Sequence, residues 1–176
     1  TAAPPSGDDR INGIAVHPLT GFVHVVGTTR SSTLPGSAVG TQATSGGFDD
    51  AFIARLPADL MGPAASTVRY TFIGGGDIDR GNTLAIDPRS GDVFVAGSSN
   101  GGLPPAMLLG AAQGTVAGNG DGFVARFKQD LSAVVRATYL GGSGPDQARS
   151  IAMHPLSGEL LIAGTTSSCN LPQVAG

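Results

Sequence analysis

The stretch Ile14-Ala15-Val16-His17-Pro18-Leu19-Thr20-Gly21 organises this chain, because it occurs three times. It returns as Leu84-Ala85-Ile86-Asp87-Pro88-Arg89-Ser90-Gly91 and as Ile151-Ala152-Met153-His154-Pro155-Leu156-Ser157-Gly158, at offsets of 70 and 67 residues. Self-similarity at a nearly fixed period is typical of a repeat architecture. In each copy an apolar segment runs into a turn that contains proline and ends in glycine, and a second apolar segment follows. This pattern predicts a repeated β-hairpin.

Each complete copy is predicted to contain four strands. In the first copy these lie at about residues 12–17, 22–27, 50–56 and 67–73. The second copy repeats this plan, and the third reaches only its second strand. We therefore expect ten strands, in a tail (residues 1–7), two complete units (8–76 and 77–143) and the first half of another (144–176). The first two strands of each unit are apolar on both faces and are expected to be the most buried.

Two long connections interrupt the repeats, at residues 28–49 and 98–120. Loops of this length are uncommon unless they have a function. We expect both to emerge on one face, opposite the proline turns, and to form the binding face. On this interpretation residues 98–120 can be shortened without loss of the fold.

The composition excludes several classes of protein. The chain has 28 glycines, 12 prolines, 40% apolar and 13% charged residues, which favours short strands joined by tight turns over disorder. A formal net charge of −3 provides no field that would recruit nucleic acid. No stretch approaches the roughly 18 apolar residues of a membrane helix, so no membrane insertion is expected.

The single cysteine, Cys169, cannot form an internal disulfide. It is interpreted either as a semi-buried loop residue or as a reactive or intermolecular thiol. The start at Thr1, with no basic segment and no apolar segment behind it, is typical of a mature or internal start.

Four separated blocks recur in order and narrow the type of repeat. They are Gly13-Ile14-Ala15-Val16 with its proline turn, Val-x-Val-x-Gly-Thr-Thr, Asp50-Ala51-Phe52-Ile53-Ala54-Arg55-Leu56 and Tyr70-Thr71-Phe72-Ile73-Gly74-Gly75. This set resembles the bacterial SBBP repeat of seven-bladed β-propellers, with the NHL-type propeller as second choice, and it covers nearly the whole chain after Gly7. The resemblance implies an all-β propeller with antiparallel four-stranded blades, of which this chain supplies about two and a half. It also implies an exported or surface protein of structural or binding type, and it carries no catalytic residue over.

Aspartates recur at matching positions near the strand ends. Asp9, Asp79 and Asp146 precede the first strand of each copy, and Asp50 and Asp121 begin the third strand. We expect all five on the loop face, and we name this set the carboxylate rim. Clustered carboxylates can bind a cation or another ligand. Alternatively, each aspartate caps its own turn by accepting backbone N–H bonds, which a structural requirement would repeat in every unit.

Other polar residues carry weaker signals. His17 and His154 share one turn position with Asp87, which favours turn capping over metal binding, and no histidine pair has zinc-like spacing. Arg55 and Arg126 end the third strands, where they either clamp an acidic ligand or form structural bonds. No Gly-x-Ser-x-Gly motif is present, and the Gly runs precede strands rather than helices. The sequence therefore predicts no catalytic residues, no metal and no cofactor.

The function expected from these patterns is that of a non-catalytic propeller module, a structural or protein-binding scaffold outside the cytoplasm. Its place would be extracellular, cell-surface or periplasmic, and its partners a protein or further blades. A glycan- or ligand-binding module that uses the long loops is the alternative. A propeller enzyme would need residues that this stretch does not contain. Because a partial propeller exposes strand edges and apolar faces, the stretch is also expected not to stand alone as a monomer.

Overall fold

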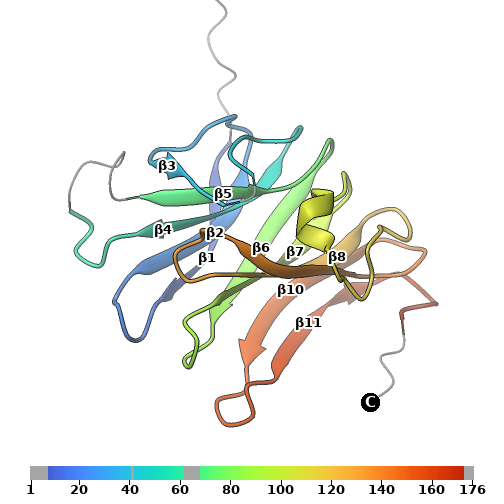
Figure 1. The fold of residues 1–176 in the computed structure, drawn as a ribbon. Helices are drawn as coiled ribbons and strands as arrows, with labels where there is room; N and C mark the ends of the chain where they lie inside the picture. Colours follow the sequence, from blue (N-terminus) through green and yellow to red (C-terminus); the bar gives the residue numbers. More distant parts are fainter. Residues whose placement is uncertain (1–7, 41, 62–67, 173–176) are drawn as a thin grey trace, which may run out of the picture.

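A computed structural model describes residues 8–40, 42–61 and 68–172, and all of the regular structure in it except one short 3₁₀ helix is β-sheet. Figure 1 shows the repeats as successive sheets that lie side by side. The strands and the helix have these bounds: β1 Arg10–Val16, β2 Val23–Thr29, β3 Ser37–Ala38, β4 Asp50–Leu56, β5 Arg69–Ile73, β6 Asp79–Ile86, β7 Val93–Ser99, η1 Pro105–Leu108, β8 Asp121–Phe127, β9 Val134–Leu140, β10 Asp146–Met153 and β11 Leu160–Thr166.

The strand order within each sheet follows the repeat. The first sheet has the order β1-β2-β4-β5-β3 and the middle sheet β6-β7-β8-β9, while the third consists of β10 and β11. Each pair of neighbours is antiparallel except β3, which pairs in parallel with β5 through two residues. The four-stranded antiparallel unit is therefore confirmed twice. The prediction of ten strands missed β3, which is too short to leave a periodic signal.

The sheets pack face to face through alternating side chains. Val26 and Ile53 of the first sheet pack with Leu84 and Phe123 of the middle sheet in the largest core cluster. On the other side of the middle sheet, Ala96 packs with residues of β10. Because side chains of a strand point alternately to its two faces, one apolar strand can serve both contacts.

A β-bulge near the start of the first strand of each sheet adds a polar contact between the sheets. The bulge shifts the register between Ile11 and Gly13 in β1, and the same shift recurs in β6 and β10. Asn12 donates from Nδ2 to the Gly81 carbonyl oxygen at 2.8 Å, and Asn82 donates in the same way to Ala148, also at 2.8 Å. The bulge therefore places one amide in each of the first two repeats where it bonds the next sheet.

The prediction that the first two strands of each copy are the most buried is wrong for the outer sheets. β1 and β11 are largely exposed, whereas β5, the fourth strand of the first copy, is buried along four of its five residues. The reason is position in the stack. Among the described residues, only the middle sheet has a neighbouring sheet on both faces. The face of β5 is also covered by residues of the first long connection, including Leu34.

Residues 98–120 are packed more deeply than expected for a surface loop that can be shortened without loss of the fold. Leu103 and Met107 of this segment are 5% and 1% exposed and belong to the main core cluster. η1 contacts β9, and the Leu103 amide donates to the buried Tyr139 hydroxyl. Only parts of the connection, such as Leu109, are exposed. The loop therefore completes the core as well as lining the surface.

Candidate functional site: the carboxylate rim

The structure places the five predicted aspartates at one end of the strands. In the middle sheet Asp79 pairs with Ser99, which in turn pairs with Asp121, so the three residues form a row across the sheet. The other sheets repeat this row as Asp9, Thr29 and Asp50 and as Asp146 and Thr166. Successive rows are joined by backbone bonds, because Asp79 N–H donates to the Asp49 carbonyl at 2.6 Å and Asp146 N–H to Gly120 at 2.9 Å.

Four of these aspartates cap turns in the same way. Asp79 accepts from the backbone N–H of Gly75 at 2.7 Å, Asp146 from Gly142 at 2.7 Å and Asp121 from Ala117 at 3.0 Å. Asp50 accepts from Gly46. The donor lies four residues before the aspartate each time, and in these bonds the accepting oxygen is Oδ2. The turn-capping interpretation is therefore confirmed for these four residues.

The caps leave a polar atom unpaired in each buried carboxylate. Asp50, Asp79 and Asp121 are 0% exposed and Asp146 is 3% exposed, and the Oδ1 atom of all four is buried without a hydrogen-bond partner among the described residues. Asp50 and Asp79 come from neighbouring sheets and both approach the Cα of Gly74. A Cβ at that position would lie 2.6 Å from Asp50 Oδ1 and 2.8 Å from Asp79 Oδ2, so only glycine fits.

Burial of these oxygens changes their proton affinity. Burial raises the pKa of Asp79 to about 6. The nearby polar groups of Ser99, Gly75 and Gly101 oppose the rise, and the nearby Asp50 adds to it. The pKa values of Asp50 and Asp121 are raised for the same main reason, burial. Burial acts on Asp146 too, but hydrogen bonds led by that of Thr166 outweigh it, and the pKa of Asp146 is lowered.

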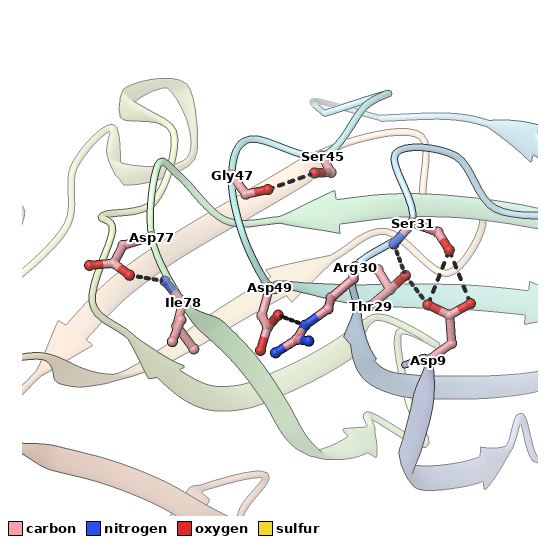
Figure 2. Close-up of polar contacts among 9 residues, drawn as sticks. All are labelled: Asp9, Thr29, Arg30, Ser31, Ser45, Gly47, Asp49, Asp77 and Ile78. Atoms are coloured by element: carbon pink, nitrogen blue, oxygen red, sulfur yellow. Dashed lines mark hydrogen bonds and ion pairs between the residues drawn. The ribbon is translucent and has the colours of Figure 1, made fainter. Parts of the chain in front are cut away.

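Asp9 differs from the other four because it is exposed. Its carboxylate accepts from the hydroxyls of Thr29 and Ser31, and Ser31 N–H donates to Thr29 Oγ1 at 2.9 Å. Figure 2 shows this group beside the pair between Arg30 Nε and Asp49 Oδ1, 2.5 Å apart. The side chain of Asp49 raises the pKa of Arg30 by its hydrogen bond. The exposed part of the rim is therefore polar and carries both signs of charge.

The turn histidines also act as caps. His17 Nδ1 accepts from the backbone N–H groups of Leu19 and Thr20, both at 3.2 Å, and His154 Nδ1 accepts from Ser157 N–H at 3.1 Å. Asp87 accepts from Arg89 N–H at 2.9 Å in the middle copy. Figure 1 shows these three turns on the same side of the molecule. The predicted equivalence of histidine and aspartate at this position is confirmed.

The two strand-end arginines have structural contacts. Arg126 forms an ion pair with the buried carboxylate of Asp92, with its Nη2 2.7 Å from Asp92 Oδ2. The Arg55 guanidinium lies over the ring of Phe22, 4.1 Å from its centroid. Such stacking is favourable for a cation. Both contacts hold the strand end against the neighbouring strand or turn.

Three further findings limit the chemistry of this surface. Within the described ranges, no group of three or more His, Cys, Asp or Glu side chains is placed to hold a metal ion. Among the same residues no helix has the length and apolar content needed to cross a membrane. Cys169 is exposed, so its interpretation as a semi-buried residue is wrong, and its thiol is free.

Sequence reasoning missed the hydroxyls and glycines that surround the aspartates. Ser99 and Thr166 close the rows opposite Asp79 and Asp146, and Gly75 and Gly142 supply the capped N–H groups. The sequence did contain a signal for these glycines, because Gly75 precedes Asp79 and Gly142 precedes Asp146 by the same four residues. The sequence does not show that two sheets meet at these glycines, and this contact gives the glycines their role.

Comparison with known proteins adds no family assignment, because no family model and no curated protein matches this chain.

Proposed function

We propose that this chain is a non-catalytic β-repeat module that acts as a scaffold and binds protein through its open sheet faces. The proposal includes the propeller-type arrangement and the exported or cell-surface location that the resemblance to SBBP repeats implies. At the rim, the proposal is supported by the four buried aspartates, whose carboxylates accept backbone N–H bonds as turn caps. Each carboxylate has a folding role that recurs from sheet to sheet, as expected of a structural part.

The observation that carries the proposal is a difference between equivalent residues. Ile14, Leu84 and Ile151 occupy the same position of the first strand in the three copies, opposite Val25, Val95 and Ile162. Leu84 and Ile151 are each 8% exposed because the preceding sheet covers them, whereas Ile14 is 68% exposed. Val16, on the same face as Ile14, is 60% exposed. The apolar face of the first strand is thus covered by the preceding sheet in the second and third copies and is open in the first copy. Exposed apolar faces of this kind mark interaction sites.

The alternative is a glycan- or ligand-binding module that uses the loop end. Its support is the exposed polar group of Figure 2, where Asp9, Arg30 and Asp49 offer hydrogen-bonding groups of both signs beside one another. Sugar hydroxyls are recognised by such groups. This alternative predicts binding on a glycan array that is lost on Asp49→Ala and is insensitive to changes in β1.

The scaffold function predicts association through the β1 face. Sedimentation velocity of the full chain should show concentration-dependent association, and Ile14→Lys should weaken it by at least about tenfold because a charge would be buried in the contact. Leu19→Lys is the matched control, since Leu19 is 76% exposed but lies in the turn rather than on the strand face. It should associate like the wild type. A chain that remains monomeric at all accessible concentrations, or an Ile14→Lys variant that associates normally, would contradict the proposal.

A further inference from the structure

Each complete unit brings two arginines together where its third and fourth strands meet. Arg55 of β4 pairs with Arg69 of β5, and Arg126 of β8 pairs with Arg136 of β9 at the equivalent position of the middle sheet. Side chains of directly opposed residues lie on the same face of a sheet, where like charges destabilise each other. A carboxylate beside such a pair would therefore stabilise it.

The middle sheet supplies this carboxylate from its own chain. Asp92 Oδ2 accepts from Arg126 Nε at 2.8 Å and lies 2.7 Å from Arg126 Nη2. Lys128 Nζ lies 3.8 Å from the same oxygen. Asp92 is only 3% exposed, and a charge at such a buried position needs a partner of opposite sign. The middle sheet thus shows how the arginine at this strand end binds an aspartate.

The first sheet has the two arginines without the acid. Phe22 stands where the middle copy has Asp92, since each follows the glycine of its proline turn and precedes the second strand. The Phe22 ring holds the Arg55 guanidinium by stacking, but it offers no oxygen to its N–H groups. Arg55 forms no hydrogen bond or ion pair with a described residue, and its Nε is buried without a partner. The guanidinium is therefore held in place with its donors free.

A cavity of about 610 Å³ lies beside Arg55. Arg55 lies on the same side of β4 as Ile53, which packs against the middle sheet, so its side chain is directed between the two sheets. The cavity is lined by Arg55 and Phe22 of the first sheet and, across from them, by Lys128, Gln129 and other residues of the middle sheet. Strands and turns of the two complete units therefore enclose it.

The charges around this cavity favour an anion. Those that line it or act on Arg55 belong to three cations and two acids, namely Arg55, Arg69, Lys128, Asp92 and Asp130. Asp92 is already paired with Arg126. Asp130 accepts from Ser132 N–H at 3.0 Å and from its hydroxyl at 2.6 Å. Burial and the nearby Arg69 lower the pKa of Arg55, and Asp130 opposes this shift. A bound anion would relieve the same unfavourable charge.

We propose that Arg55 anchors a binding site for the side-chain carboxylate of an aspartate or glutamate of a partner protein. The carboxylate would bind the Arg55 guanidinium as Asp92 binds that of Arg126, and Arg69 and Lys128 would add positive charge. The choice of a protein as the source rests on the proposed function, whereas the choice of a carboxylate rests on the comparison of the two sheets. The site is separate from the β1 face, so Ile14→Lys should leave it unchanged and either contact can fail alone.

The test is an NMR titration of the full chain, at low ionic strength, with aspartate blocked as its N-acetyl N-methylamide. We expect a saturable shift of the Arg55 Nε–H resonance and of amides around the cavity, and no such shift with blocked asparagine. Arg55→Gln should weaken binding by at least about tenfold, because charge-assisted hydrogen bonds are lost. Arg69→Gln should weaken it less, and Arg136→Gln is its matched control in the middle sheet and should have no effect.

Substitutions of Phe22 give the sharpest comparison. Phe22→Asp copies the middle sheet, so its own carboxylate should occupy Arg55 and weaken binding of the blocked aspartate by at least about tenfold. Phe22→Asn removes the ring in the same way without adding a charge, and it should keep the binding. Circular dichroism checks the fold of each variant.

Three results would overturn the proposal: no saturable shift with the blocked aspartate, equal shifts with blocked asparagine, or equal binding by Phe22→Asp and Phe22→Asn. Glucuronate and inorganic phosphate are the competing anions. Tighter binding of either one than of the blocked aspartate would overturn the assignment of the site to a protein side chain.

Discussion

Replacing Met107 with alanine is expected to lower the free energy of unfolding by about 3 kcal/mol, because it opens a cavity in the main core. Met107 is 1% exposed and lies in η1, within a connection that the sequence predicts to be a surface loop. It packs in one cluster with Leu103, Phe123 and Tyr139. Urea unfolding followed by circular dichroism measures the change as a shift of the midpoint at constant slope.

Leu109→Ala provides the matched control two residues away. Leu109 is 78% exposed, so its truncation should change the free energy of unfolding by about 0.5 kcal/mol or less. Equal effects of the two substitutions would contradict the assignment of η1 to the core. A stable variant lacking most of residues 98–120 would contradict it as well.

The second large effect is that the titration of Asp79 makes the free energy of unfolding depend on pH. Burial raises the pKa of Asp79 from 3.8 to about 6 in the folded chain. The folded state therefore binds more protons than the unfolded state between these values, and the free energy of unfolding rises as the pH falls from about 6 towards 4. A shift of this size corresponds to about 3 kcal/mol, which is the destabilisation present above pH 6.

Asp79→Asn should remove this dependence. An asparagine keeps a carbonyl oxygen that accepts from Gly75 N–H, and it carries no charge beside Asp50. We expect the variant to be more stable than the wild type at pH 7 by up to about 3 kcal/mol, with a smaller slope between pH 4 and 6. Burial lowers the pKa of His24, which makes its contribution oppose that of Asp79 in mild acid, and the comparison of variant with wild type cancels it. Thermal unfolding in a series of buffers measures both slopes.

Asp146→Asn is the control at the equivalent position of the third sheet. Hydrogen bonds lower the pKa of Asp146 in the folded state, so its stabilising contribution is present above pH 3.8 and is lost as the pH falls below that value. The Asp146 variant should therefore be less stable than the wild type at pH 7 and should keep the slope between pH 4 and 6. A rise in stability at pH 7 for Asp146→Asn, or a fall for Asp79→Asn, would contradict the opposite pKa shifts of these two residues.

Local pattern determined much of this molecule. The three copies of the Ile14–Gly21 stretch predicted the hairpins and the capping role of His17, His154 and Asp87, and the blocks that recur with the stretch predicted the four strands of the two complete units. These features depend on alternation and on turn chemistry, which act over a few residues and recur with the repeat. The capping role of the buried aspartates was open between two interpretations for the same reason, because a recurrent acid can serve a turn or a ligand.

Only the tertiary structure decided which copies of a repeated residue are covered. Ile14, Leu84 and Ile151 are equivalent in sequence, yet the first is open and the other two are buried, because burial depends on the sheet that lies in front. The same holds for Gly164, whose counterparts Gly27 and Gly97 lie under phenylalanine rings. It also holds for Met107, which lies in a connection between two strands but packs into the main core beside β9. Contacts between residues far apart in the chain set these outcomes, and no window of sequence contains both partners.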